Sequence, residues 1–347
     1  YSPRLLGKAF WLTLILFVAI TLGLLFGESA TMKEANSDPL CLGPAVLGYG
    51  APGDLPVKIP AKGAGYPVCS SRWGNGNMTW DAQLDIFDFA SLAFASYYDS
   101  EKDIRASLGT TFRGTQLNQW ELLEVEPAET IGRWIVVDFP QQKVRVVAVR
   151  GTATKKDMYA DLQVYSSVAV FQIMSMMTPV LKTLGSDQVR RLVQFSERSG
   201  IAMATPFWEG FVEAVGKHRT EAMAREYTLL LTGHSLGGAL VGLASAFYHV
   251  HGIAFSAPGL YYQTGSLGFD DEALLRFFTN VKPRHDIVPR VDQQTGSVNS
   301  ISCQEMPAVC HRLAKTTCEL WSKCGDPRGR DFRQSCSQWY KRSDLGL

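Results

Sequence analysis

Ser235 is the residue whose surroundings point most directly to chemistry. It lies in the stretch GHSLGG, between a run of strand-forming residues that ends near Thr232 and a helical pattern of alanine, leucine and valine. A serine at such a junction can occupy the tip of a sharp strand-to-helix turn, because Gly233 and Gly237 let the strand and the helix approach closely. The spacing predicts a nucleophile above the carboxyl edge of a sheet. The alternative is a glycine-rich turn that only packs the strand on the helix.

A serine hydroxyl becomes an effective nucleophile when a histidine accepts its proton and a carboxylate orients that histidine. In the known hydrolases whose nucleophilic serine stands at such a turn, the acid and then the histidine follow it along the chain. This order leaves His285 or His311 as the base. Asp286 follows a predicted strand, where the acid belongs, and it cannot orient its own neighbour, so elimination leaves His311 as the candidate base. We expect structural or solvent-facing roles for the other histidines, which are His218, His234, His249 and His251.

The third requirement is a pair of N–H groups that bind the oxyanion formed when the serine attacks a carbonyl carbon. The residue after the nucleophile, Leu236, supplies one candidate. The other is expected on a loop that follows an earlier strand. The run VRVVAV ends at Arg150 and Gly151, and the loop begins with Thr152. Thr152 is therefore the second oxyanion-hole candidate.

The elements that must position these residues form an alternating pattern of strands and helices. The first two predicted strands are separated by PQQK, a plausible hairpin turn, and a helix is expected to begin near Asp81. This pattern favours an α/β fold with a predominantly parallel, helix-covered sheet. The predicted strands are Trp134–Phe139, Val144–Val149, Thr228–Thr232, Gly252–Ser256 and Leu274–Val281, and the core candidates of the first helix are Leu84, Phe87, Leu92 and Phe94.

Three motifs in this order resemble the class 3 (fungal-type) lipases: VAVRGT followed by Asp161, then GHSLGGAL, then DIVPRV. The resemblance covers residues 80 to 347. It implies an α/β-hydrolase fold and hydrolysis of carboxylic esters of lipids, acylglycerols or phospholipids, through an acyl-enzyme. It also implies that Ser235 is the nucleophile, that Asp286 is the acid, and that Thr152 and Leu236 form the oxyanion hole.

The chain departs from the family pattern in two places. Members often have a histidine in a motif before the strand that leads to the serine, where this chain reads FWEGF with Trp208 in that place. The stretch from Asp161 to Trp208 is also longer than the usual lid region. Within it, Leu162–Leu181 is uncharged and contains three methionines. We expect a lid with a soft apolar surface, and the alternative is an ordinary core helix.

His311 lies in a cysteine-rich tail that spans 303–336. The spacings contain no CxxC pair, so we expect neither a zinc site nor any other metal or cofactor. A disulfide-bound loop fits an oxidising compartment. Some class 3 lipases of eukaryotes have a similar CH…CEL…CGD tail, which supports His311 as the base; the alternative is a stapled surface tail with an incidental histidine. The seven cysteines cannot all pair internally, and their pairing is open.

The N-terminal region reads as a membrane anchor. Ala9–Phe26 is free of charge and would span about 27 Å as a helix, close to the thickness of the hydrocarbon core of a bilayer. Arg4 and Lys8 precede it and Glu28 follows, which places the short N-terminus on the cytosolic or matrix side. The alternative is a secretory signal peptide, whose apolar region is usually shorter.

The expected organisation follows from these observations. Residues 1–27 form a transmembrane anchor, 28–78 form a proline- and glycine-rich connector, and 79–347 form the α/β-hydrolase domain. Asn77 opens a possible glycosylation sequon. The protein is then a single-pass membrane protein whose catalytic domain lies in a secretory or endolysosomal lumen or, alternatively, in the mitochondrial intermembrane space. We expect Tyr1–Gly27 to dock onto another membrane protein or a second copy of the chain.

Composition limits the possible partners and functions. The chain has 34 basic and 33 acidic residues, which gives no electrostatic reason to expect nucleic acid. The expected partners are a lipid substrate and a membrane. Two function classes stay open: a working lipid esterase, and an accessory or structural subunit of a membrane assembly that retains a lipase fold.

Overall fold

The structure is a computed structural model, and it describes residues 66–74, 82–127, 130, 132–151, 187–191, 208–264, 269, 271–332 and 336–337. Among these residues, no helix is both long enough and apolar enough to cross a bilayer. Several predictions lie outside the described residues and stay predictions. They concern the anchor at 1–27, most of the connector, the sequon at Asn77, the oxyanion candidate Thr152 and the expected lid at 162–181.

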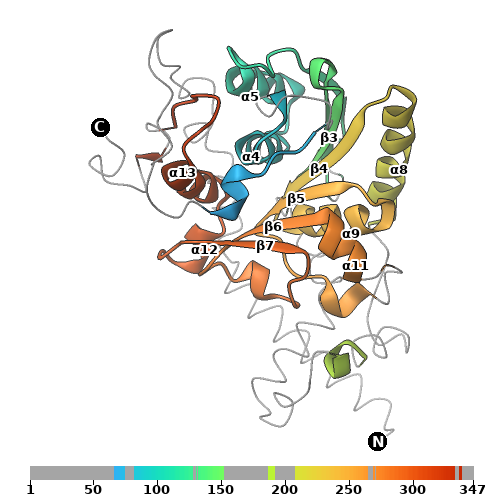
Figure 1. Cartoon of the computed structure of the whole chain (residues 1–347), viewed down its shortest axis with the longest axis vertical. Coiled ribbons are helices and arrows are strands. Elements are labelled where there is room, and N and C mark those ends of the chain that lie inside the picture. The colour runs from blue at the N-terminus through green and yellow to red at the C-terminus, as the bar shows by residue number, and fades with distance from the viewer. Residues whose placement is uncertain are drawn as a thin grey trace, which may run out of the picture.

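A seven-stranded sheet forms the centre of the fold, with its strands in sequence order from β1 to β7 (Figure 1). The first three strands are antiparallel neighbours, and each later pair of neighbours is parallel. The predicted, predominantly parallel sheet is therefore confirmed. The strands are β1 (Glu121–Val125), β2 (Trp134–Phe139), β3 (Val144–Val149), β4 (Thr228–His234), β5 (His251–Phe255), β6 (Phe278–Pro283) and β7 (Ser297–Ile301).

Strands β2 and β3 have the predicted bounds, and the turn between them is a hairpin. The 3₁₀ helix η3 (Pro140–Gln142) closes it, and Lys143 takes the left-handed conformation with φ 50°. One predicted strand needs correction: residues 274–277 belong to a helix, and β6 starts only at Phe278. Acidic residues in the first turn of this helix, an arginine in its last turn and the helix-forming run Ala-Leu-Leu between them explain the difference.

Helices cover both faces of the sheet, and alternate strand residues point to each face. One core cluster joins α4 and α13 to one face, and the other joins α8, α9 and α11 to the opposite face (Figure 1). All ten residues of α4 are buried. The helices are α4 (Ile86–Ala95), α5 (Glu101–Phe112), α8 (Glu209–Ala224), α9 (Leu236–Tyr248), α11 (Asp271–Phe277), α12 (Pro307–Cys310) and α13 (Leu313–Cys324).

Helix α4 is the helix that we expected near Asp81, and it begins at Ile86. Asp85 sets this start, because its carboxylate accepts the N–H groups of Phe87 and Asp88, while the Asp88 carboxylate accepts the N–H of Asp85. This reciprocal pair is a capping box built from two aspartates. The four expected core residues, Leu84, Phe87, Leu92 and Phe94, are all buried.

The C-terminal tail is held to α4 by a buried cluster of charges. Arg330 lies 2.8 Å from carboxylate oxygens of both Asp88 and Asp326, and Arg328 lies 2.8 Å from Asp88. Burial alone would raise the pKa of Asp88, but the two arginines outweigh it and lower that pKa. The cluster therefore joins parts of one domain that lie about 240 residues apart.

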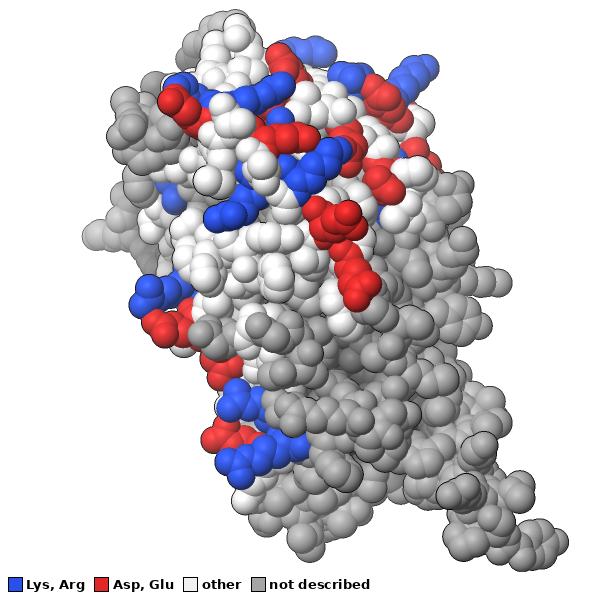
Figure 2. Space-filling model, turned by 90° about the vertical axis from the view of Figure 1, so that its right-hand side faces the viewer, with Lys and Arg blue, Asp and Glu red and all other residues white. Residues whose placement is uncertain are grey.

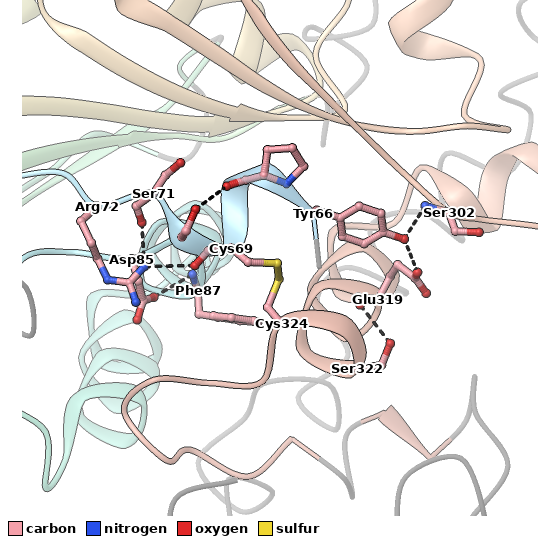
Figure 3. Close-up of a disulfide and its surroundings, with 12 residues drawn as sticks. Tyr66, Cys69, Ser71, Arg72, Asp85, Phe87, Ser302, Glu319, Ser322 and Cys324 are labelled. Carbon is pink, nitrogen blue, oxygen red and sulfur yellow. Dashed lines mark hydrogen bonds between the residues drawn. A yellow bond between two sulfur atoms is a disulfide. The ribbon is translucent and has the colours of Figure 1, made fainter. Parts of the chain in front are cut away.

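Three disulfides bind the described cysteines, which confirms the predicted disulfide-bound tail. They join Cys303 to Cys310, Cys318 to Cys336 and, across a separation of 255 residues, Cys69 to Cys324. Figure 3 shows the last of these, which ties the 3₁₀ helix η1 (Pro67–Ser70) to the end of α13. Beside it, the Tyr66 hydroxyl donates to Glu319 and accepts the N–H of Ser302. The packed domain therefore reaches back at least to Tyr66, into the expected connector.

The described surface mixes charges of both signs. On the side of the molecule that Figure 2 presents, basic and acidic side chains lie intermingled. Elsewhere on the described surface, charges of opposite sign form exposed pairs within one helix, such as Arg276 with Glu272 on α11. The described residues on the face in Figure 2 therefore form no extended surface of a single charge.

Candidate active site

Ser235 stands at the sharp turn between β4 and α9. Its backbone angles, φ 58° and ψ −129°, lie in a region that residues other than glycine rarely adopt. In such a strained turn the serine hydroxyl projects away from the main chain. A Cβ atom at Gly233 would lie 2.6 Å from the carbonyl oxygen of Gly237, and one at Gly237 would lie 2.5 Å from that of Val149. Both positions therefore require glycine, for the reason that the motif predicts.

The imidazole of His311 lies between Ser235 and Asp286 and contacts both side chains. Its Nε2 lies 2.9 Å from the Ser235 hydroxyl oxygen, and its Nδ1 lies 2.9 Å and 3.0 Å from the two carboxylate oxygens of Asp286. A carboxylate only accepts, so Nδ1 carries the hydrogen and Nε2 is free to accept the serine proton. Residues 76 and 25 positions apart in sequence thus form one hydrogen-bonded series.

The local fold fixes the positions of Asp286 and His311. Asp286 follows β6 and is fully buried, and one of its carboxylate oxygens also accepts the N–H of Val288 at 3.0 Å. His311 caps the end of α12 and is buried. By contrast, His285 is exposed. The imidazole that contacts both Asp286 and Ser235 is therefore that of His311.

Leu236 is the first residue of α9, so its N–H belongs to the unpaired group at the helix N-terminus that favours negative charge. The second oxyanion candidate, Thr152, lies outside the described residues, which end at Gly151 in this part of the chain. A Cβ atom at Gly151 would collide with the main-chain oxygen of His234 and with the Tyr97 hydroxyl, and would lie 2.8 Å from the Ser235 Cβ. The backbone that leads toward Thr152 therefore passes directly against the turn.

Two further side chains lie behind the turn. His234 is fully buried, as the prediction of a structural role allows; its Nδ1 lies 2.8 Å from the Tyr97 hydroxyl and its Nε2 lies 2.8 Å from the main-chain oxygen of His311. The sequence did not lead us to Tyr97. It lies 137 positions before His234 in the chain, and no local sequence pattern indicates a contact over such a separation.

The remaining histidines lie away from Ser235. His218 is buried on α8 beside Arg145, Glu124 and Glu221, whereas His249 and His251 pack against the ring of Phe277. Within the described ranges, no group of three histidine, cysteine, aspartate or glutamate side chains could hold a metal ion.

Solved structures that resemble the chain are fungal lipases. The Lip2 lipase from Yarrowia lipolytica is 14% identical, with 62% of this chain and 76% of that chain covered and a TM-score of 0.37. The lipase from Rhizopus microsporus var. chinensis is 17% identical, with coverage of 63% and 72% and a TM-score of 0.32. At such low TM-scores these likenesses carry no argument. A search of the curated proteins finds no match.

The family model described as Lipase (class 3) matches residues 146–295. That segment contains the turn with Ser235, the helix α9 and Asp286, and it lies within the region where the sequence motifs resemble this family. Residues 146–295 are thus a class 3 lipase segment, and the chain is a lipase-like carboxylic ester hydrolase.

Proposed function

We propose that this chain is a membrane-anchored serine hydrolase that cleaves carboxylic esters of lipids, acylglycerols or phospholipids, through an acyl-enzyme on Ser235. The observation that carries the proposal is the unbroken series of hydrogen bonds from the Ser235 hydroxyl through the imidazole of His311 to the carboxylate of Asp286. The class 3 lipase match supports a lipid ester as the substrate.

In the first half-reaction, the Ser235 oxygen attacks the ester carbonyl while its proton passes to Nε2 of His311. Asp286 stabilises the imidazolium that forms. The N–H groups of Leu236 and Thr152 bind the negative oxygen of the tetrahedral intermediate. The intermediate collapses as His311 gives its proton to the leaving alcohol, and the acyl group stays on the serine.

The second half-reaction repeats the sequence with water. His311 takes a proton from water, and the resulting hydroxide adds to the acyl carbon. When this second intermediate collapses, the proton returns to the oxygen of Ser235 and the carboxylic acid leaves. No step requires a cofactor.

The proposal includes the location of the protein. Three disulfides fit an oxidising compartment, such as a secretory or endolysosomal lumen or the mitochondrial intermembrane space. The apolar run Ala9–Phe26 supports a membrane anchor, and the basic residues that precede it favour placing the hydrolase domain on the opposite side of the membrane from them. Tyr1–Gly27 would dock onto another membrane protein or a second copy. Retention of the full chain in membranes after alkaline extraction tests the anchor, and release of the chain would refute it.

A fluorophosphonate probe tests the chemistry, because it reacts covalently with an activated serine. We expect labelling of the native chain and of Ser245→Ala, a control that removes another buried serine on α9. Ser235→Ala should abolish labelling, and ester turnover in Ser235→Ala or His311→Ala should fall by about 10⁴- to 10⁶-fold. A folded native chain that neither reacts with the probe nor hydrolyses emulsified triacylglycerol or phospholipid vesicles would instead favour an accessory subunit.

A further inference from the structure

A second hydrogen-bonded series lies next to the turn with Ser235. It joins the main chain of Gly151, through Tyr97 and His234, to the main chain of His311. The N–H of Gly151 lies 3.1 Å from the Tyr97 hydroxyl, which lies 2.8 Å from Nδ1 of His234. On its other side, Nε2 of His234 lies 2.8 Å from the main-chain oxygen of His311. Every group in this series is buried.

The direction of each bond follows from the groups involved. The carbonyl oxygen of His311 can only accept, so Nε2 of His234 carries a hydrogen and donates it. In the neutral ring Nδ1 then accepts, which makes the Tyr97 hydroxyl its donor. The same hydroxyl oxygen accepts the N–H of Gly151. Each member thus has one defined role, and the series fixes the tautomer of His234.

The ring of His234 is suited to stay neutral in this place. Burial lowers its pKa, the nearby imidazole of His311 lowers it further, and the result is a pKa of about 3. The ring centroids of the two histidines lie 4.8 Å apart. When His311 becomes an imidazolium in the proposed reaction, the neutral ring of His234 therefore adds no second positive charge that would repel it.

We propose that Tyr97 and His234 are positioning residues, which hold the main chain of His311 and the end of β3 at Gly151 in one fixed arrangement around Ser235. The inference rests on the proposed function. Neither side chain takes part in the proton transfers. Their effect comes through the base, whose imidazole must meet the serine oxygen, and through the backbone that leads toward Thr152.

The surroundings of His311 show why such a support matters. The residue comes from the C-terminal tail, where it caps the short helix α12 before the chain turns into α13. The turn with Ser235 belongs instead to the central sheet. The bond from His234 is a direct link from the turn itself to the backbone of the base. A displacement of about 1 Å in a reacting group can reduce the rate by about 100-fold.

Four substitutions separate the two arms of the series. Tyr97→Phe removes one oxygen atom and breaks the contacts to Gly151 and His234. His234→Gln places an amide near the position of Nε2 and keeps a donor for the His311 carbonyl, whereas His234→Asn keeps only an acceptor near the position of Nδ1. Tyr98→Phe is the matched control, since the Tyr98 ring packs against Phe94 instead.

The measurement is kcat and KM for a soluble short-chain ester, together with the rate of fluorophosphonate labelling, well below the melting temperature of each variant. We expect Tyr97→Phe and His234→Asn to lower kcat and the labelling rate by about 10- to 100-fold with KM changed less than about 3-fold. His234→Gln should retain activity within about 5-fold of the native chain, because it keeps the donor to His311. Tyr98→Phe should behave like the native chain.

The outcomes distinguish this inference from the proposed function. If the native chain is labelled and active, but Tyr97→Phe and His234→Asn match Tyr98→Phe, the positioning role is wrong and the triad stands. The same holds if His234→Gln loses as much as His234→Asn, since a role in packing alone predicts no rescue. If the native chain is neither labelled nor active, both proposals fail. Should His234→Asn not fold, Tyr97→Phe, the smaller change, decides.

Discussion

Cys303 and Cys310 are joined by a disulfide, and from Cys310 the chain continues directly into His311. The two cysteines of this bridge lie only seven positions apart in the sequence, between β7 and His311. The bridge therefore acts on the local path of the backbone that presents His311. A bridge that closes so short a loop restricts the unfolded chain only a little. Its contribution to the free energy of unfolding is about 2 kcal/mol in the chain-entropy description.

Removal of this bridge should accordingly reduce activity while the chain stays folded. We expect the Cys303→Ala/Cys310→Ala double variant to lose at least about 10-fold in kcat while its free energy of unfolding falls by only about 2 kcal/mol. Ester turnover at 25 °C and urea unfolding measure the two effects. Full activity in the folded double variant would show that the bridge does not position the base.

The bridge between Cys69 and Cys324 should behave in the opposite way. Its cysteines are 255 residues apart, so it restricts the unfolded chain strongly. Its contribution to the free energy of unfolding is about 5 kcal/mol in the same description. The Cys69→Ala/Cys324→Ala double variant should unfold at a much lower urea concentration, yet keep its activity per folded molecule because Ser235 lies elsewhere. Equal urea midpoints for the two double variants would contradict this expectation.

The contrast between predicted and observed features has a physical basis. The turn at Ser235 and strands β2 to β5 are visible in the sequence because glycine spacing and runs of β-branched residues are local signals. Edge strands β1 and β7 carry polar, partly exposed residues such as those of Glu121–Val125, so their pattern is weak. The proposal of His311 as the base came from chain order and elimination, which depend on chemistry rather than on periodicity.

Long-range contacts account for most of what we did not predict. The bond between Tyr97 and His234, the cluster around Arg330 and the bridge from Cys69 each join segments that lie far apart in the chain. None of them changes the hydrophobic pattern of its own segment. Only the folded arrangement brings these groups together.

The glycine at 237 should tolerate no side chain. A Cβ atom there would lie 2.5 Å from the carbonyl oxygen of Val149 and 2.7 Å from that of Arg150, and backbone atoms cannot move away as a flexible side chain can. We expect Gly237→Ala to destabilise the fold by about 1–3 kcal/mol and to suppress probe labelling. Gly210→Ala is the control: that site on α8 is open, so alanine should stabilise by about 0.4–1 kcal/mol. Equal effects of both substitutions on thermal unfolding would refute the steric account.

The buried arginine at 330 should contribute far more to stability than an exposed one. Arg330→Met leaves the carboxylates of Asp88 and Asp326 buried without this partner, and breaking such a pair costs about 3–5 kcal/mol. Arg276→Met removes an exposed pair with Glu272 on α11, worth about 0–1 kcal/mol. Urea unfolding of both variants checks the difference. A loss below about 1 kcal/mol for Arg330→Met would show that the cluster does not hold the tail.

Acid should destabilise the fold through His234. Its pKa is about 3 in the folded chain, against about 6.5 for an unfolded histidine. Between these values the unfolded chain binds a proton that the folded chain does not, so this residue makes stability rise with pH from about 3 to about 6.5. The slope it contributes is at most about 1.4 kcal/mol per pH unit.

Other groups titrate in the same interval and must be separated from this effect. Burial and the neighbouring Asp88 raise the pKa of Asp85 to about 6, so the folded chain holds that proton longer and stability falls as the pH rises from about 4 to about 6. The two contributions oppose each other in the native chain. In the difference between the native chain and His234→Gln, the contribution of Asp85 cancels and that of His234 remains. The free energy of unfolding of the native chain minus that of the variant should therefore increase with pH between 4 and 6, and a difference independent of pH would show that His234 is not held neutral by its surroundings.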